Sequence, residues 1–267
     1  MKVYLSKINE SWIIDRVRAE WYQYNGAIST DSIDEADIIW IISPWLWKKE
    51  KKKALRNKHV VCSIYHFEEN DFINSGLKDF KRRDKYVDTY HVISKKTLKE
   101  LEQLTNKKIV YIPFWVNQNI WFPIEDRESL RSKYKIPNNS YVVGSFQRDT
   151  EGKDLISPKL IKGPDQFLKI VNQLNQIHDN LIILLAGKRR QFVISELEKL
   201  GIHYVYREMV DDSVLNELYN CLDLYVVASR KEGGPQAIVE CGISKSPIIS
   251  TDVGVASEIL SNDSIFN

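Results

Sequence analysis

Two glutamates flank a Gly-Gly-Pro run in the segment ASRKEGGPQAIVECG, residues 228–242: Glu232 precedes the run, and Glu240 follows its proline by five residues. Glycines let a ligand approach the backbone closely, and the free N–H groups at a helix N-terminus favour an anion. If the helix starts at the proline, Glu240 lies about 7.5 Å along its axis. A diphosphate at the helix end would then have a carboxylate on each flank, one for a sugar and one for a ribose. The alternative is a plain helix start with two surface glutamates.

Basic residues gather at the end of an expected strand in the segment VGSFQRDTEGKDLISPKLIKGPDQ, residues 143–166. The strand ends at Gly144, Arg148 follows it, and Lys162 precedes a Gly-Pro pair that opens the next helix. Two cations at the carboxyl edge of a strand could neutralise a pyrophosphate, although either one alone is better explained as part of a solvated loop. Residues 187–189, Gly-Lys-Arg, predict a third basic loop on the same edge.

Short apolar runs alternate with helical patterns in the second half of the chain, as in a parallel sheet whose strands are joined by helices. The expected strands are 141–144, 181–185, 203–206, 224–228 and 247–250. The expected helices are 164–177, 190–200, 213–222 and 235–243, with a short one from about Val255. This alternation predicts a Rossmann-like layer with right-handed crossovers.

The first half has a similar pattern, with strands expected at 3–5, 36–42, 60–64, 89–93 and 108–112 and a helix at about 95–103. Two such domains in series would bring the carboxyl ends of their strands together across a cleft, where open α/β sheets bind ligands. We therefore predict an α/β fold of two Rossmann-like domains. The first is the acceptor-side domain at 1–118, a connection rich in proline and asparagine covers 119–139, and the donor domain is 140–267.

Composition excludes several classes of protein. The 267 residues hold 38 Lys and Arg against 36 Asp and Glu, and the net charge of +2 argues against a nucleic-acid protein. The three cysteines lack metal-ligand spacing, no apolar run reaches the ~18–20 residues of a membrane span, and no signal-peptide core is present. We therefore expect a cytoplasmic protein, and without an Asp-x-Asp pair after a strand we expect no bound metal.

Nine of the eleven glycines lie from Gly144 onward and all seven tryptophans lie before residue 122, so the two halves have different tasks.

The runs GSFQRD…PKLIKGPDQFLKIV, LYNCLDLYVVASRKEGGPQAIVECG and SPIISTDVG resemble a family 4 retaining glycosyltransferase with the GT-B fold. HVISKKTLKEL and IVYIPFWVNQNIWFP are similar to that family's exit from its first domain, so the resemblance covers about residues 90–265. It implies transfer of a hexose from a nucleoside-diphosphate sugar, UDP rather than GDP, with retention of configuration and with no metal or other cofactor. It implies an acceptor that is lipid-linked, a glycan or another molecule.

The resemblance also implies roles for single residues. Glu232 would contact the donor sugar, Glu240 the ribose hydroxyls, and Arg148 with Lys162 the diphosphate. The other donor contacts are expected from Gly144, Gly233, Gly234, Pro235, Gln236, Arg207, Met209 and Val210, of which the last three follow the strand 203–206 and would face the base. No carboxylate is placed as a covalent nucleophile, so the family suggests an internal-return mechanism in which Glu232 orients the sugar.

The first half resembles the family at one further residue but departs from it in one loop, and the end of the chain departs from it as well. His66 follows the strand 60–64 and is similar to a histidine on the acceptor side of the cleft, which would make it catalytic, but a lone histidine there is more often structural. The loop after the first strand, SKINESW, has no glycine, although the family usually has a glycine-rich loop there. Seven residues follow GVASEIL where the family continues, so we expect an abbreviated C-terminus: a minimal enzyme, a truncated gene or a chain that needs a partner.

Two tryptophans, Trp45 and Trp47, precede a run with seven basic residues in 48–58. Tryptophans beside a basic helix could dock on anionic lipid, which would make the protein peripheral at a membrane, and a solvated helix face is the alternative. Two other functions remain open. One is a non-catalytic nucleotide-sugar-binding or scaffold protein of the same fold, which the missing glycines and the short C-terminus favour. The other is another GT-B enzyme such as a sugar-nucleotide epimerase.

Overall fold

The computed structural model describes residues 1–7, 13–68, 72–152 and 154–267. The chain forms two compact units, Met1–Pro113 and Phe114–Asn267, and each is built around one parallel sheet. The predicted α/β class with two parallel sheets is confirmed. The predicted domain limits and the cleft stay predictions; residues 119–139 include the helix α5 (Arg127–Lys133) and belong to the second unit.

The second unit holds a doubly wound sheet in the order β11-β10-β9-β6-β7-β8, in which every pair is parallel. The strands are β6 (Tyr141–Ser145), β7 (Leu181–Ala186), β8 (Tyr204–Arg207), β9 (Leu224–Val227), β10 (Ile248–Thr251) and β11 (Ile265–Phe266). The chain runs outward from β6 to β8 and then returns to β9 on the other side of β6. The strand order therefore reverses between β6 and β9, and open α/β sheets bind ligands at the carboxyl ends beside such a reversal.

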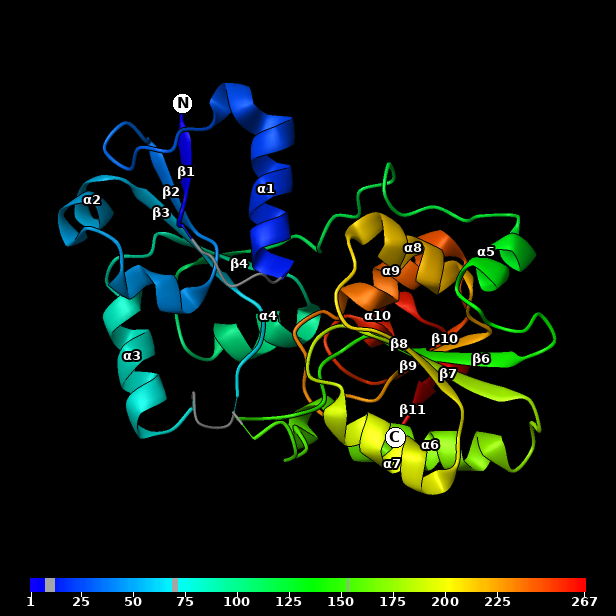
Figure 1. Ribbon diagram of the computed structural model, residues 1–267. Coiled ribbons are helices and arrows are strands. Elements are labelled where there is room, and N and C mark those ends of the chain that lie inside the picture. The colour runs from blue at the N-terminus through cyan, green and yellow to red at the C-terminus, as the bar shows by residue number, and fades with distance from the viewer. Residues whose placement is uncertain (8–12, 69–71, 153) are drawn as a thin grey trace. The chain divides into compact units, whose positions relative to one another are not determined.

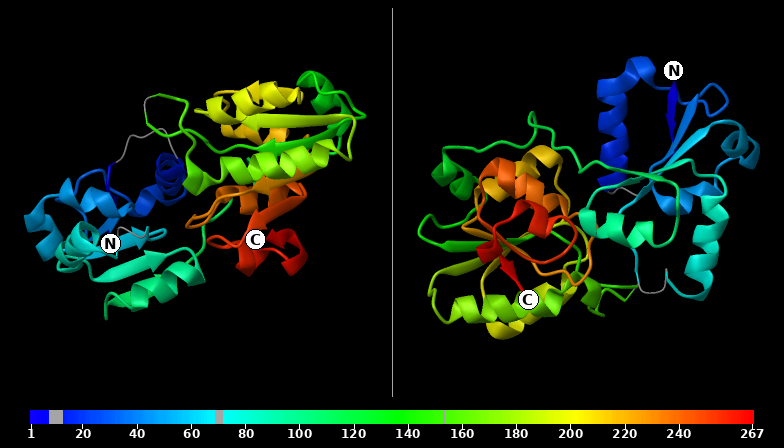
Figure 2. Two further views of the ribbon diagram at one scale, coloured as in Figure 1. Left: turned by 90° about the horizontal axis from the view of Figure 1, so that it is seen from below. Right: turned by 180° about the vertical axis from the view of Figure 1, so that it is seen from behind.

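Helices cover both faces of this sheet (Figures 1 and 2). On one face lie α6 (Pro164–Asn175) and α7 (Gln191–Leu200), and on the other α8 (Asp212–Asn220), α9 (Gln236–Ser244) and α10 (Ala256–Ile259). Phe167 and Leu197 belong to one buried core, and Leu218 and Ile238 to the other. Burial from both sides explains why a strand such as Leu181–Ala186 is continuously apolar.

The helix α5 is fixed to the second unit by buried arginine contacts. Arg131 donates to the carbonyl oxygens of Cys221, Asn138 and Ser140, and its NH2 lies 2.6 Å from Asp223 Oδ2. Burial alone would raise the pKa of the Asp223 carboxyl, but hydrogen bonds from the Val142 N–H and two arginines outweigh it and hold the pKa below its usual value. The Pro- and Asn-rich segment therefore packs against the second sheet because of side chains whose partners lie about 90 residues away.

The sheet of the first unit runs in the order β1 (Val3–Leu5), β2 (Ile38–Ile41), β3 (His59–Ile64), β4 (Thr89–Val92) and β5 (Lys108–Tyr111), all parallel. Val3 pairs with Ile38 on one side and forms a parallel bridge with Ser29 on the other, so the chain first passes outside β1 and then returns to β2. The helix α1 (Ile13–Asn25) covers one face, with Trp21 edge-on to Trp40 at 5.1 Å.

The helix α3 (Asn74–Asp84) covers the opposite face of this sheet. Its Phe80 stacks on Tyr90 with the ring centroids 5.8 Å apart. The other α-helices in the described part of this unit are α2 (Lys52–Asn57) and α4 (Lys95–Glu102). Short 3₁₀ turns occur at Gly26–Ile28, Pro44–Lys48, Leu160–Lys162 and Asn262–Ser264. Among the helices of the described residues, none is long and apolar enough to cross a membrane.

Gly163 lies where the start of α6 meets the end of β9. Its φ is +63°, and a Cβ on it would lie 1.7 Å from the carbonyl oxygen of Ala228. Only glycine allows this approach, which holds the residues before α6 against the loop that follows β9.

Replacing Gly163 by alanine should lower the free energy of unfolding by more than about 2 kcal/mol, because the left-handed φ costs roughly 1–2 kcal/mol and the Ala228 carbonyl must also move. Gly201→Ala is the matched control, since its φ is +66° but nothing lies within 4 Å of the added Cβ. Urea unfolding of the two variants and the parent measures the difference. Equal losses in both variants would contradict the close approach at Gly163.

Candidate active site

An ion pair between Lys162 and Glu232 lies at the centre of the site. The Lys162 ammonium, just ahead of α6, donates to Glu232 Oε1 at 2.5 Å, and Glu232 lies in the loop between β9 and α9. The two side chains are 20% and 16% exposed. They are shielded enough for a strong interaction and still open enough to meet a ligand. The pair joins residues 70 apart at the carboxyl side of the strand-order reversal.

A hydrogen-bond network holds this pair. The Ser229 hydroxyl lies 3.1 Å from Glu232 Oε1 and 3.2 Å from Gln147 Oε1, while Gln147 Nε2 donates to the Lys162 carbonyl at 2.7 Å. Thr251 Oγ1 in turn donates to the Ser229 carbonyl at 2.6 Å. Sequence reasoning missed Gln147, Ser229 and Thr251. Their signal was the presence of a polar residue at or just beyond the carboxyl end of three adjacent strands, β6, β9 and β10.

The glycine run lies against the loop that follows β10. Gly254 has φ +52°, and a Cβ on it would lie 2.3 Å from the Gly233 carbonyl oxygen. The helix α9 begins at Gln236, so Pro235 is its N-cap with ψ 116° and not its first residue as predicted, whereas Pro164 does open α6. The Gln236 Oε1 atom is buried and has no hydrogen-bond partner in the part of the chain that the structure describes.

Glu240 lies on the inner face of α9 and is 3% exposed. Its Oε2 accepts a hydrogen bond of 2.9 Å from the Tyr219 hydroxyl. Burial, and after it the charge of Glu240, raises the pKa of Tyr219 well above its usual value, so the hydroxyl stays a donor. A role of Glu240 at a ribose stays a prediction.

The two predicted cations do not lie in equivalent surroundings. Arg148 follows β6 and is exposed, and no hydrogen bond or ion pair joins it to another described residue. Its neighbour Asp149 is 2% exposed and pairs with Arg190, which is 1% exposed, at 3.4 Å. The Asp149 N–H donates to the Arg189 carbonyl at 2.9 Å, so the loops after β6 and β7 are tied together. Arg148 thus extends from an anchored loop.

The other expected donor residues lie at the same edge of the sheet or within it. Gly144 is inside β6, where a Cβ would lie 2.5 Å from Leu222 Cδ1, so packing alone explains this glycine. Arg207 ends β8, Met209 is 62% exposed, and Val210 packs against the core. Their contacts with a base stay predictions.

His66 belongs to the first unit and follows β3, with its Nε2 4.0 Å from Glu68 Oε1. Of the glycine-free loop SKINESW, residues 8–12 lie outside the described residues. The described residues contain no group of three or more His, Cys, Asp or Glu side chains that could hold a metal ion.

A family model described as "Glycosyl transferases group 1" matches residues 126–265, more than half of the chain. The chain belongs to this family. The resemblance of the sequence motifs is thereby confirmed, and the matched range contains the Lys162–Glu232 pair and its network.

A curated relative, the alpha-galactosylglucosyldiacylglycerol synthase of Streptococcus pneumoniae, is 25% identical over 168 residues, which cover 59% of this chain and 41% of that protein. The chain thus spans about two fifths of the relative it matches. HepE of Anabaena, solved with UDP and glucose, has a TM-score of 0.76 at 14% identity over 97% of this chain and 83% of its own. Sucrose-phosphate synthase of Thermosynechococcus elongatus has a TM-score of 0.68 at 14% identity over 97% and 66%. These likenesses confirm the predicted GT-B fold.

The Asp149–Arg190 pair predicts a pH dependence of stability. Burial raises the pKa of Asp149 to about 6, above the value of about 3.9 in an unfolded chain. The folded protein therefore binds this proton more tightly, so the contribution to stability is complete below about pH 4 and is lost as the pH rises through about 6. Asp149→Asn removes this titration. The free energy of unfolding of the parent minus that of the variant should therefore decrease as the pH rises from about 4 to about 6.

Asp211→Asn is the control of opposite sign. Asp211 caps α8, and a hydrogen bond from the Val214 N–H holds its pKa below the usual value, so the same difference should rise with pH up to about 4 and stay nearly flat above it. Urea midpoints measured from about pH 2 to about pH 7 cover both windows. A flat difference for Asp149→Asn would contradict the raised pKa.

Proposed function

We propose that this chain transfers a hexose from a UDP-sugar to an acceptor hydroxyl with retention of configuration at the anomeric carbon. The observation that carries the proposal is the Lys162–Glu232 pair, held at 2.5 Å at the carboxyl side of the β6–β9 reversal and beside the start of α6. A glycosyl donor needs a cation for its leaving diphosphate and a carboxylate for its sugar hydroxyls. The pair offers both groups, at a position that solvent reaches.

In this reaction the bond between the anomeric carbon and the β-phosphate oxygen breaks, and the acceptor oxygen bonds to the same face of that carbon. The acceptor proton passes to the departing phosphate oxygen, so no protein carboxylate is needed as a base or a nucleophile. The transition state has oxocarbenium character by analogy with glycoside hydrolysis, and its main requirement is stabilisation of negative charge on the leaving group.

Each predicted residue takes one part of that requirement. Lys162 and Arg148 neutralise the diphosphate, helped by the backbone N–H groups of residues 233–236 at the start of α9. Glu232 accepts hydrogen bonds from the sugar once Lys162 turns to the phosphate, and Glu240 accepts from the ribose. The loop of Arg207, Met209 and Val210 covers the base, and His66 acts on the acceptor side.

Two relatives support the donor and the acceptor. HepE, whose fold is similar, has been solved with UDP-glucose, which supports UDP as the leaving group. The Streptococcus pneumoniae relative is named for a glycosylated diacylglycerol, which supports a lipid acceptor and a place at the membrane surface. A non-catalytic nucleotide-sugar-binding protein is the alternative, and it predicts donor binding without release of UDP.

Lys162→Met should lower kcat at saturating donor by about 100-fold or more, because one charge-stabilising donor at a leaving group contributes a factor of roughly 10²–10³. Arg230→Met is the matched control. Arg230 lies in the same loop as Glu232, but it pairs with Asp165 at 2.7 Å on a partly exposed surface, so kcat should change by less than about threefold.

The assay measures UDP release from labelled UDP-glucose and UDP-galactose, with a diacylglycerol glycolipid as acceptor and with water alone. A kcat for Lys162→Met close to that of the parent would remove Lys162 from the diphosphate. Donor binding without UDP release in the parent would favour the non-catalytic alternative.

A further inference from the structure

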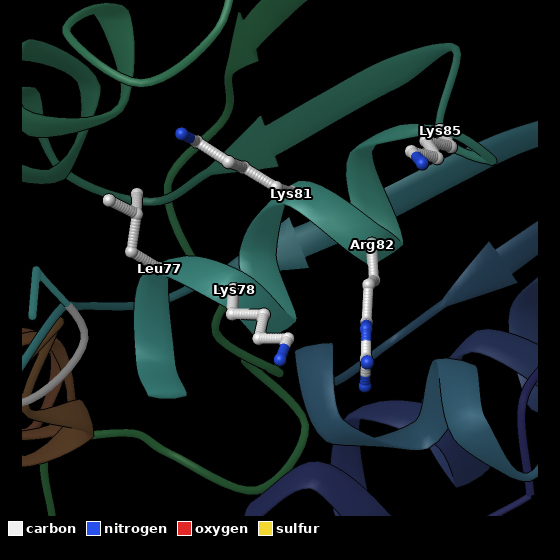
Figure 3. A pocket seen from close by; sticks show the side chains of 5 residues that line it. All are labelled: Leu77, Lys78, Lys81, Arg82 and Lys85. Carbon is white, nitrogen blue, oxygen red and sulfur yellow. The ribbon is translucent and has the colours of Figure 1, made fainter. Parts of the chain in front are cut away.

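A hollow of about 410 Å³ lies on the outer face of α3 in the first unit, remote in the sequence from every residue of the candidate active site except His66. It is lined by Leu77, Lys78, Lys81, Arg82 and Lys85, all from α3 and the residue that ends it (Figure 3). The four cations lie at positions i, i+3, i+4 and i+7, which is one face of a helix. The opposite face carries Phe80, which is buried against Tyr90.

Among the described residues, these four cations have no acidic partner. All four are exposed, and within residues 1–7, 13–68, 72–152 and 154–267 none of them forms a hydrogen bond or an ion pair. The acids of α3 are engaged elsewhere: Asp79 lies 2.7 Å from Lys48 Nζ, and Asp84 accepts from the Tyr90 hydroxyl at 3.0 Å. Like charges three and four residues apart destabilise an isolated helix, so the face gains nothing for folding from this arrangement.

The basic face continues into residues 45–58. Asp79 forms an ion pair with Lys48 and accepts a hydrogen bond of 3.4 Å from the Trp47 Nε1–H. These two contacts fix the turn Pro44–Lys48 beside α3. Trp47 itself is 7% exposed, and the Lys52 Nζ lies 4.2 Å from the centroid of its ring. The buried Trp47 therefore cannot dock on lipid as predicted from the sequence. Trp45 remains 40% exposed.

Partly exposed apolar side chains lie on α3 and directly before it in the sequence. Phe72 and Ile73, the two residues before α3, are 36% and 54% exposed, and Leu77 lines the hollow itself. A surface that pairs unneutralised cations with exposed apolar side chains complements a bilayer interface, where phosphates meet acyl chains.

We propose that the outer face of α3, with Trp45 beside it, docks on a bilayer that contains anionic phospholipid. The four cations bind lipid phosphates, while Phe72, Ile73 and Trp45 enter the boundary between headgroups and chains. The inference deepens the proposed function, because it names the surface that would bring the protein to a bilayer that holds a lipid acceptor. It rests on that function for its purpose only, since the test needs neither donor nor acceptor.

A nucleic acid fits the same surface less well. The whole chain carries a net charge of only +2, so it lacks the extended positive field that a nucleic-acid backbone requires.

The test is co-sedimentation of the full chain with vesicles of phosphatidylcholine containing about 30 mol% phosphatidylglycerol, without donor, at about 0.05 and about 0.15 M salt. Each basic residue close to such a bilayer strengthens binding roughly fivefold, so the triple variant Lys78→Gln, Lys81→Gln, Lys85→Gln should bind about 100-fold more weakly. The matched control Lys99→Gln, Lys107→Gln, Lys108→Gln removes the same charge from the same unit and should weaken binding by less than about threefold. Phe72→Ser with Ile73→Ser should weaken the binding that persists at the higher salt.

Equal weakening in both triple variants would overturn the proposal, because net charge and not α3 would then drive binding. Unchanged binding of the α3 variant, or parent protein that prefers duplex DNA to the vesicles, would also overturn it. Urea midpoints and UDP release in the absence of vesicles should match the parent for both triples. Vesicle binding is measured without donor, so a failure to bind vesicles leaves the transferase proposal intact. A chain that binds vesicles but releases no UDP from the donor refutes only the transferase proposal.

Discussion

The close approach of Gly163 to the Ala228 carbonyl is the constraint on which the candidate site depends. It brings the turn before α6 against the loop after β9, and backbone hydrogen bonds from Arg230 and Lys231 to the Ile161 carbonyl continue the contact. Lys162 then faces Glu232 although 70 residues separate them. The strand-order reversal between β6 and β9 makes this contact possible, since it leaves the carboxyl ends of two neighbouring strands open between diverging helices.

Three ion pairs of the second unit differ in their surroundings, and the differences indicate which of them can contact a ligand. In Arg131–Asp223 the arginine is buried and the carboxylate is 23% exposed, and hydrogen bonds to several backbone groups surround the pair, so it anchors α5. Asp149–Arg190 is buried more deeply. Burial raises the pKa of the Asp149 carboxyl and lowers the pKa of the Arg190 guanidinium despite the attraction between them, so the pair holds two loops together at a cost in stability. In Lys162–Glu232 both partners are partly exposed, at 20% and 16%, and they lie at the carboxyl edge of the strand-order reversal, so this pair can exchange partners with a ligand there.

The sequence predicted the order of strands and helices in the second unit because both faces of its sheet are buried, so each strand is an apolar run between helical patterns. It also predicted Glu232, Lys162 and the glycines at the strand ends, because their spacing relative to proline marks helix starts. It could not reveal Gln147, Ser229 or the Asp149–Arg190 pair, since these depend on contacts between loops distant in the sequence. The burial of Trp47 and the attachment of α5 were missed for the same reason: both rest on single side chains, Asp79 and Asp223, whose partners lie on other elements.

The central claim is that the Lys162–Glu232 edge of the second sheet binds the nucleotide sugar. Amide hydrogen exchange with and without saturating UDP-glucose tests it directly, because a ligand protects the amides whose opening it opposes. The account predicts slower exchange in peptides that cover 160–166 and 229–240, and unchanged exchange in peptides of α3. Protection confined to other segments, or none at a concentration that raises Tm, would contradict it.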